Sequence, residues 1–216
     1  MCSNHAKIRI QTLSDSHMRS NEEQTLATRK ADVKNALLRY SKQKFSEMQL
    51  KQQSTSASTL IAPISPTPHD IIVLFIPSLN LCADSFLIDL GCGDGRWLIT
   101  AATLTECKCL GIDIDDQRLC LAKQSIEKEG LSHRIEIRNQ DVFEFIEKDC
   151  EYVLNADVFV IYLFRDAMLK IGSFLQKRSN KLRQGVKILC VGFPLPHWSA
   201  IQTKRSNGLT VYMYEK

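Results

Sequence analysis

The feature that most constrains this chain is an apolar run that ends in an acidic residue and breaks into a glycine-rich turn, Phe86-Leu-Ile-Asp-Leu-Gly-Cys-Gly-Asp-Gly-Arg-Trp97. Gly91, Gly93 and Gly95 stand at every second position of this turn. Glycines at this spacing let the backbone turn tightly, adopt positive φ and approach a ligand without Cβ clashes. The run therefore predicts a strand that enters a nucleotide-binding loop.

The spacing of the loop argues against two common nucleotide sites. A dinucleotide-binding loop has the pattern Gly-x-Gly-x-x-Gly, and Arg96 stands where its third glycine would be. The phosphate loop of nucleoside triphosphatases, Gly-x-x-x-x-Gly-Lys-Ser/Thr, does not occur in the sequence. A tight turn in any α/β domain remains an alternative for the loop taken alone, so the sequence downstream has to decide.

Acidic residues follow the next two predicted strands at positions that suit a nucleoside. Asp113 ends the strand predicted at 108–113 and lies 22 residues after Gly91. This is close to the spacing of about 20 residues at which a strand-end carboxylate reaches ribose hydroxyls. Asp141 follows the strand predicted at 134–138, where it can accept a hydrogen bond from an adenine amino group. Asp141 can also cap the following short helix, and the two roles are compatible.

The order of the predicted elements indicates an α/β fold. An apolar helix start at 71–76 precedes the first strand, and later helices are predicted at 96–104, 116–129 and 165–181, with strands at 156–163 and 186–192. Two final strands, at 198–204 and 209–214, are joined through Asn207-Gly208, which is a hairpin signal. This alternation predicts a doubly wound, seven-stranded, mostly parallel sheet that ends in a β-hairpin.

The charge distribution separates a tail, residues 1–60, from a folded domain, residues 61–216. The tail holds ten Lys/Arg and five Asp/Glu, whereas the rest of the chain holds 18 and 19, so the net charge of +4 comes from the tail. We expect disorder over 1–23 and a helix over 24–50. The helix either packs on the domain with a solvated basic face or serves as a lid or a docking surface for an acidic partner.

The composition indicates the cellular compartment and argues against a metal site. The eight cysteines form no Cys-x-x-Cys pair and no Cys/His cluster with zinc spacing, so we expect free thiols, a reducing compartment and no metal. We expect no secretory signal, because the first residues lack a hydrophobic core, and no membrane span, because no run of about 18 apolar residues occurs. We expect a cytoplasmic monomer. A mitochondrial location is the alternative, because the first 20 residues are rich in Ser and basic side chains.

The pattern Asp-Leu-Gly-x-Gly-x-Gly resembles motif I of the class I methyltransferases that use S-adenosylmethionine (AdoMet). Four segments together resemble a narrower family, the small protein-lysine methyltransferases of the adenine nucleotide translocase and the ATP synthase c subunit, with their prokaryotic relatives. The segments are Pro63 to Pro68, the glycine loop at 89–96, Ala156 to Leu163, and Phe193-Pro-Leu-Pro-His-Trp198. The resemblance covers about residues 61–214.

This resemblance implies a Rossmann-like class I methyltransferase fold, AdoMet as the cofactor and a protein lysine as the acceptor. It also implies which residues hold the cofactor: Asp89, Gly91, Cys92 and Gly93 in the loop, Asp113 with Ile114, and Asp141 with Val142. The chain departs from the family in two places. Ile64 stands where the family has an aromatic residue, and the tail lacks the hydrophobic membrane segment of the eukaryotic members.

The residues after the fourth predicted strand indicate the acceptor. Methyltransferases of planar nitrogens in adenine or glutamine have Asn/Asp-Pro-Pro-Tyr/Phe there, whereas this chain has Tyr162-Leu-Phe-Arg165. A lysine amine needs no such clamp, because it is nucleophilic once neutral. Its pKa is about 10.4, so neutralising it at pH 7 costs roughly 4–5 kcal/mol. An apolar channel with a hydroxyl or carbonyl acceptor offsets part of this cost.

We expect Tyr162, Phe193 and Trp198 to line that channel. For Phe193 and Trp198 the alternative is packing in the core, and for Tyr162 it is a hydrogen-bonded hydroxyl inside the core. His197 has two interpretations as well, a general base or an exposed loop histidine, and the second is favoured.

Three functions agree with these observations. The favoured one is AdoMet-dependent methylation of a protein lysine. The second is methylation of RNA or a small molecule, for which the basic tail is the only support. The third is an AdoMet-binding module that has lost turnover.

Overall fold

The computed structural model describes residues 66–206 and 208–216. These residues belong to one compact unit, which spans Leu60–Lys216. The predicted tail over residues 1–60, with its helix over 24–50, lies outside the described residues, and so does Ile64. In the part of the chain that is described, no helix is both long and apolar enough to cross a bilayer.

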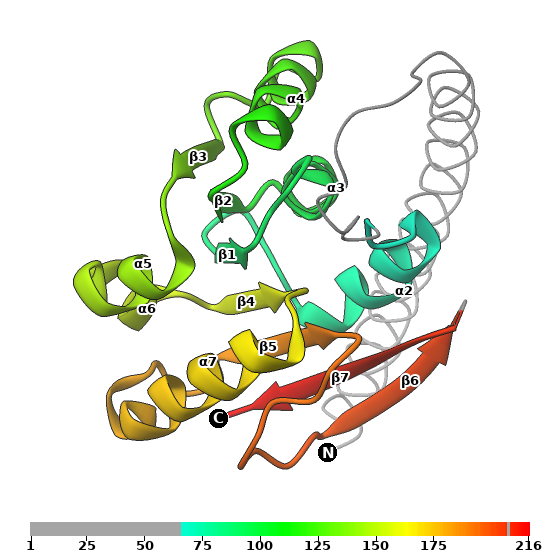
Figure 1. Cartoon of the computed structure of the whole chain (residues 1–216). Coiled ribbons are helices and arrows are strands. Elements are labelled where there is room, and N and C mark those ends of the chain that lie inside the picture. The colour runs from blue at the N-terminus through cyan, green and yellow to red at the C-terminus, as the bar shows by residue number, and fades with distance from the viewer. Residues whose placement is uncertain (1–65, 207) are drawn as a thin grey trace, which may run out of the picture. The chain divides into compact units, whose positions relative to one another are not determined.

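A seven-stranded sheet forms the centre of the described residues (Figure 1). Its strands are β1 (Phe86–Leu90), β2 (Lys108–Asp113), β3 (Ile135–Asn139), β4 (Val158–Ile161), β5 (Lys187–Val191), β6 (Gln202–Ser206) and β7 (Leu209–Glu215). Their order across the sheet is β3-β2-β1-β4-β5-β7-β6. The first five strands pair in parallel, whereas β7 runs antiparallel to both β5 and β6. The predicted doubly wound α/β sheet with a terminal hairpin is confirmed.

Helices cover both faces of the sheet, and each face has its own apolar core. The first core takes side chains from α2 (His69–Leu79), α3 (Arg96–Thr105) and α4 (Asp116–Lys128), and the second from α5 (Val142–Lys148), α6 (Cys150–Asn155) and α7 (Arg165–Lys177). In β4, Val158 and Val160 face the first core, while Phe159 and Ile161 face the second. A strand buried on both faces is apolar at every position, which is why this run was readable in the sequence.

The structure corrects several predicted boundaries. The strand predicted at 198–204 is wrong at its start, because β6 begins at Gln202. Before it, Pro196 has no N–H for the ladder and His197 is left-handed (φ 66°), so the chain turns before it joins the sheet. The helix predicted at 165–181 ends at Lys177 and is followed by the 3₁₀ turn Ser179–Lys181 (η1), and the sequence did not predict α6.

The sheet order places the glycine loop at a crevice. β1 lies between β2 and β4 (Figure 1). On one side of β1 the sheet continues through β2 to β3, and on the other side it continues through β4 and β5 to the terminal hairpin. The connections that leave the carboxyl ends of β1 and β4 therefore cover opposite faces of the sheet. In open α/β sheets ligands bind at such a switch point. Here it is occupied by the loop after Leu90 and by Tyr162, which follows β4.

Candidate active site

The glycine loop is held in a conformation that only glycine accepts easily. Gly91, Gly93 and Gly95 all have positive φ, 87°, 53° and 75°. The amides of Gly91 and Cys92 donate to the carbonyl of Ile112 in β2, at 2.8 and 3.0 Å. A Cβ at Gly91 would lie 2.5 Å from Cδ2 of Leu163. Side chains are thus excluded from the place where the loop passes the end of β4.

Asp113 shapes the loop from the neighbouring strand. Its Oδ2 accepts a hydrogen bond from the amide of Gly93 at 2.8 Å, and its Oδ1 accepts one from the amide of Asp115 at 2.9 Å. Asp115 in turn caps α4, accepting from the amides of Gln117 and Arg118. The carboxylate predicted to reach ribose hydroxyls therefore lies at the carboxyl end of β2, where it fixes both the loop and the start of α4.

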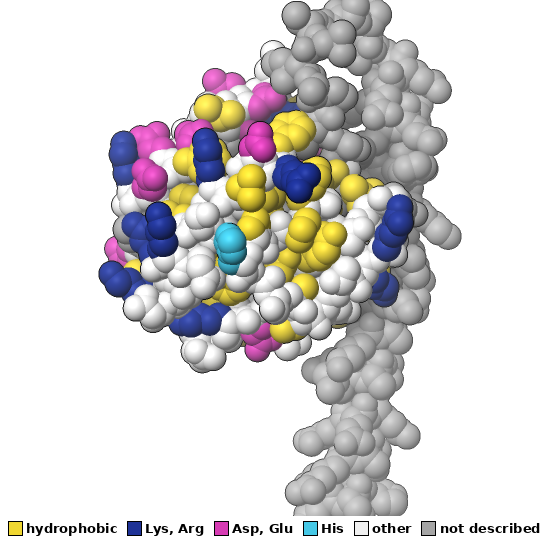
Figure 2. Space-filling model, turned by 60° about the horizontal axis from the view of Figure 1, so that its bottom comes forward, with side chains coloured by type: hydrophobic (Ala, Val, Ile, Leu, Met, Phe, Trp, Pro, Cys, Tyr) yellow, Lys and Arg dark blue, Asp and Glu magenta, His cyan; other side chains and the backbone are white. Residues whose placement is uncertain are grey.

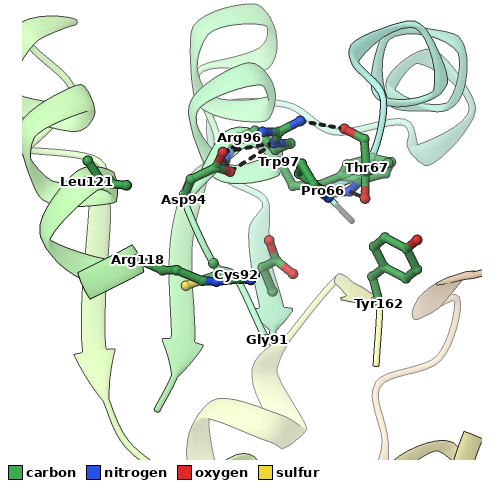
Figure 3. Close-up of a pocket in the computed structure, with 12 residues that line it drawn as sticks. Pro66, Thr67, Gly91, Cys92, Asp94, Arg96, Trp97, Arg118, Leu121 and Tyr162 are labelled. Carbon is green, nitrogen blue, oxygen red and sulfur yellow. Dashed lines mark hydrogen bonds and ion pairs between the residues drawn. The ribbon is translucent and has the colours of Figure 1, made fainter. Parts of the chain in front are cut away.

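Two adjoining hollows open around the loop. The first has a volume of about 220 Å³ and is lined by Pro66, Thr67, Asp89, Gly91, Cys92, Gly93, Asp94, Arg96, Trp97, Arg118, Leu121 and Tyr162 (Figure 3). The second has a volume of about 180 Å³ and is lined by Gly91, Asp113, Ile114, Arg118, Asp141, Val142, Phe143, Tyr162, Leu163 and Ala167. The two share Gly91, Arg118 and Tyr162, so their lining residues together mark one path along the crevice.

The first hollow contains the buried carboxyl group of Asp89. Asp89 is only 2% exposed, and its burial, together with the charges of Asp113 and Asp94, raises its pKa well above the usual range. For Asp94, burial alone would raise the pKa, but the hydrogen bonds and charge of Arg96 outweigh it and lower the pKa. A cation placed beside Asp89 would relieve the repulsion between these carboxylates. The first hollow therefore suits a positively charged group.

The second hollow combines an apolar wall with a carboxylate. Ile114 is 69% exposed, which is unusual for a large hydrophobic side chain, and Val142 lines the same space. Asp141 caps α5: its Oδ1 accepts from the amides of Phe143 and Glu144, at 2.8 and 3.0 Å. Both of these bonds go to the same oxygen, so Oδ2 can accept from a ligand. An aromatic base with an amino group fits this arrangement, and the capping role predicted for Asp141 is confirmed.

Tyr162 stands where the two hollows meet. Its ring packs against the backbone after β5, since a Cβ at Gly192 would lie 3.2 Å from Cε2 of Tyr162. Burial raises the pKa of Tyr162, so its phenol stays protonated and neutral over the physiological range. Tyr162 can therefore offer a neutral hydroxyl and an aromatic face to a group that enters between the hollows.

The other aromatic residues predicted for the channel are placed differently. Trp198 packs edge-on against Tyr214, with ring centroids 6.5 Å apart, and borders the second core. Phe193 is 38% exposed. Neither residue is among the described residues that line the two hollows. The segment between them is anchored by the amide of Leu195, which donates to Oη of Tyr214 at 2.8 Å. His197 is exposed, as its favoured interpretation predicted.

Several lining residues were not singled out from the sequence. Thr67 is 3% exposed and joins the first hollow from the Pro-Thr-Pro segment, which entered only as part of the family resemblance. Arg118 reaches across the loop from α4 (Figure 3). Its place one turn into a helix that follows Asp113 was the only signal that could have found it. Arg96 and Trp97 were read as the start of a helix rather than as parts of the site.

The described residues that line these hollows include neither a reactive cysteine nor a metal-binding cluster. Cys92 lines the first hollow, is 5% exposed, and has a pKa raised well above the usual range by burial and by the nearby Asp89. A buried thiol of this kind behaves as a small apolar side chain. Within residues 66–206 and 208–216, no group of three or more His, Cys, Asp or Glu side chains is placed to hold a metal ion.

Comparison with known proteins gives a consistent result. Residues 89–202 match the ANTKMT methyltransferase domain. A protein-lysine N-methyltransferase of Saccharolobus islandicus is 30% identical over 159 residues, which cover 70% of this chain and 92% of that protein. A ribosomal protein L11 methyltransferase of Escherichia coli is 36% identical over 86 residues, but these are only 27% of its length. A solved RNA methyltransferase of Salinibacter ruber, in complex with S-adenosyl-L-homocysteine, has a TM-score of 0.62 at 27% identity and covers 69% of this chain and 92% of its own.

Proposed function

Because the chain belongs to the ANTKMT methyltransferase family, we propose that it transfers a methyl group from AdoMet to the side-chain amine of a lysine in a protein substrate. The family match confirms the resemblance inferred from the motifs. The observation that carries the proposal is the pair of joined hollows around the glycine loop, with Tyr162 at their junction.

The residues of this path fit AdoMet part by part. AdoMet, when bound, supplies an electrophilic methyl group on a positively charged sulfur. In the first hollow, Asp89 would face the cationic part, and the backbone of Gly91 and Gly93 permits close approach. In the second, Asp113 would hold the ribose hydroxyls.

The base of the cofactor completes the fit. The exposed face of Ile114 and the side chain of Val142 would cover the adenine, and the second oxygen of Asp141 would accept from its amino group. Cys92 would line the first hollow with a small apolar side chain. All eight residues predicted to hold the cofactor thus lie along one path.

The acceptor side depends on Tyr162. A protonated lysine has no lone pair for the transfer, so it must lose its proton before the methyl group moves. The partly desolvated surroundings of Tyr162 disfavour an ammonium ion, and its hydroxyl can orient the neutral amine. Holding the amine in line with the methyl group is the main source of acceleration for such a displacement. Phe193 and Trp198 lie outside the two hollows, so we assign them no contact with the cofactor or the amine.

A protein lysine is favoured as the acceptor by two observations. The Saccharolobus islandicus relative is a protein-lysine N-methyltransferase. The residues after β4, Tyr162 to Arg165, lack the Asn/Asp-Pro-Pro-Tyr/Phe clamp for a planar nitrogen. Both point to a substrate whose reacting atom is a flexible aliphatic amine.

RNA is the second acceptor class, because the Salinibacter ruber structure is that of an RNA methyltransferase. RNA-binding proteins need a continuous basic track that neutralises phosphates. On the face drawn in Figure 2, Lys and Arg side chains stand apart around the rim, with hydrophobic and acidic side chains between them. This face offers no such track, so we place RNA behind protein.

The test uses the purified full chain with methyl-labelled AdoMet and a cell extract. We expect label in protein, and acid hydrolysis should release it as methylated lysine. Label that resists protease and is lost on ribonuclease treatment would refute the lysine proposal and favour RNA. Failure of AdoMet and S-adenosylhomocysteine to bind in calorimetry would refute the whole assignment.

The proposal also covers the cellular location and the oligomeric state of the protein. We propose a monomer that acts in the cytoplasm on a protein substrate. Light scattering of the purified chain tests the monomer, and a fluorescent fusion tests the location. A mitochondrial signal would instead favour the transit-peptide interpretation of the first 20 residues.

A further inference from the structure

We infer that Arg96 and Trp97 are positioning residues that latch residues 66–68, here called the strap, over the first hollow. The inference rests on the proposed function, because it says how the wall of the AdoMet site is kept in place. Its observations are the contacts of Thr67, which joins the strap to the first turn of α3.

Thr67 is held through both its side chain and its backbone. Nε1 of Trp97 donates to Oγ1 of Thr67 at 3.1 Å, and each of these residues is 3% exposed. Nη1 of Arg96 donates to the carbonyl oxygen of Thr67 at 2.9 Å. Hydrogen bonds shielded from water in this way are costly to break, because each leaves an unpaired polar atom behind.

Arg96 can hold the strap because its other two nitrogens bind Asp94 and so fix the position of the guanidinium. Nε donates to Oδ1 of Asp94 at 2.9 Å, and Nη2 pairs with Oδ2 of the same carboxylate. This fork fixes the plane of the guanidinium and leaves Nη1 directed at Thr67 (Figure 3). A lysine cannot form the fork and reach the carbonyl of Thr67 at the same time.

The strap needs such a latch because its own backbone supplies few hydrogen bonds. Pro66 and Pro68 have no N–H, so neither can be tied down through a backbone donor. On the far side, the carbonyl of Pro68 accepts from the amide of Ile71 at 3.1 Å, which begins α2. The strap is therefore anchored at one end by α2 and at its middle by the latch.

The latch couples the strap to the glycine loop. Arg96 and Trp97 directly follow Gly95, the last glycine of the loop, and Pro66 and Thr67 line the same hollow as that loop (Figure 3). Tyr162 also lines this hollow. Release of Thr67 would therefore widen the space in which the cofactor and the amine must be held together. We expect weaker AdoMet binding and poorer alignment, with the rest of the fold intact.

The main experiment is a double-mutant cycle on AdoMet affinity measured by calorimetry. Thr67→Val removes the hydroxyl with little change of shape, and Trp97→Phe removes the indole N–H together with the ring that carries it. We expect either variant to weaken AdoMet binding roughly fivefold, and the double variant to lose no more than about tenfold, because both singles break the same bond.

The chain offers a matched control for each change. Oγ1 of Thr100 and Nε1 of Trp198 are buried and have no hydrogen-bond partner among the described residues. Thr100→Val and Trp198→Phe therefore repeat the two chemical changes without breaking a bond, and AdoMet affinity should stay within about twofold of the unmodified chain.

A fluorescence measurement reports on the latch without AdoMet. The chain has two tryptophans, so the Trp198→Phe variant emits from Trp97 alone. Adding Thr67→Val in that background should let acrylamide quench Trp97 several times faster, whereas Thr100→Val should not. Arg96→Ala should increase quenching as well, and Arg96→Lys should restore it only in part.

The outcomes separate the latch from the function. If the Thr67→Val and Trp97→Phe losses are no larger than those of their controls, or if the two losses multiply in the double variant, the latch is wrong. Unchanged quenching of Trp97 on Thr67→Val also contradicts it. If the unmodified chain does not bind AdoMet, the proposed function fails, while the quenching result still decides the contact between Thr67 and Trp97.

Discussion

At the scale of single residues, Asp89 carries the sharpest electrostatic prediction. Its burial and its acidic neighbours raise its folded-state pKa, so the fold favours the protonated form. Folding stability should therefore fall as pH rises from the ordinary carboxyl pKa through the raised one, and stay constant above it. Asp89→Asn removes this penalty, so the variant should be more stable than the unmodified chain at neutral pH, with a difference that vanishes in acid.

The same substitution should harm binding, because a cation beside Asp89 favours its ionised form, and Asn cannot supply that counter-charge. We expect affinity to fall at least about tenfold. Denaturant unfolding across the acid range, together with calorimetry, measures both effects. Stability curves of the two proteins that run parallel from acid to neutral pH would contradict the assignment of Asp89.

Tyr162 gives a prediction about the pH dependence of turnover. Because burial raises the pKa of its phenol, it does not titrate below its usual range and cannot be the group that sets the rise of activity with pH. We expect Tyr162→Phe to lower kcat by about tenfold or more through lost orientation of the amine, with the inflection of the pH–rate profile unmoved. A shift of that inflection would identify Tyr162 as a base instead.

The sequence predicted residues with local signatures and missed those defined by long-range contacts. The positions of Asp113 at a strand end and of Asp141 at a helix start were predictable, because both have short-range signals. Thr67 was not, since its burial depends on the indole of Trp97, 30 positions away. Trp198 was expected either in the channel with Tyr162 or in the core, and its ring packs on Tyr214 at the second core. The periodicity of apolar residues in the sequence does not predict which of two aromatic side chains a loop residue packs against.

At the scale of elements, the glycine loop can be tested against a control in the same chain. Gly91 and Gly130 both have positive φ, 87° and 69°. A Cβ at Gly91 would clash with Leu163, whereas nothing lies within 4 Å of a Cβ at Gly130. Each Gly→Ala change should cost about 1 kcal/mol for the left-handed backbone.

Only Gly91→Ala should have effects beyond this backbone cost. We expect it to cost a further 1 kcal/mol or so from overpacking and to weaken AdoMet binding at least about tenfold. Thermal unfolding and calorimetry of the two variants measure the contrast. Equal effects of both changes on AdoMet affinity would mean that the close approach of the loop to the end of β4 is not what shapes the site.

Elements inside the sheet were easier to predict than those at its margin. The helix at 96 and the strand at 108–113 began where the sequence predicted, because buried apolar runs and glycine breaks mark them. The start of β6 was missed because alternation in Trp198 to Lys204 looked like a strand, while Pro196 and His197 turn the chain first. Edge segments carry little apolar signal, since β6 is almost wholly exposed.

At the scale of the whole molecule, we propose that residues 61–216 carry the catalytic activity and that the basic tail does not. A variant that lacks residues 1–60 should bind AdoMet with an affinity within about twofold of the full chain, because every residue assigned to the cofactor lies after position 60. Calorimetry of both proteins tests this. A large loss of affinity would show that the tail completes the site.

The central claim is that this chain methylates a lysine of a protein through the crevice around its glycine loop. The most direct measurement is mass spectrometry of lysine methylation in cells that have or lack the protein, with the unmodified chain or Tyr162→Phe returned to the latter. We expect methylation at a defined lysine to disappear without the protein, to return with the unmodified chain, and to stay low with Tyr162→Phe. Unchanged lysine methylation, accompanied by loss of a methylated RNA nucleotide, would contradict the claim.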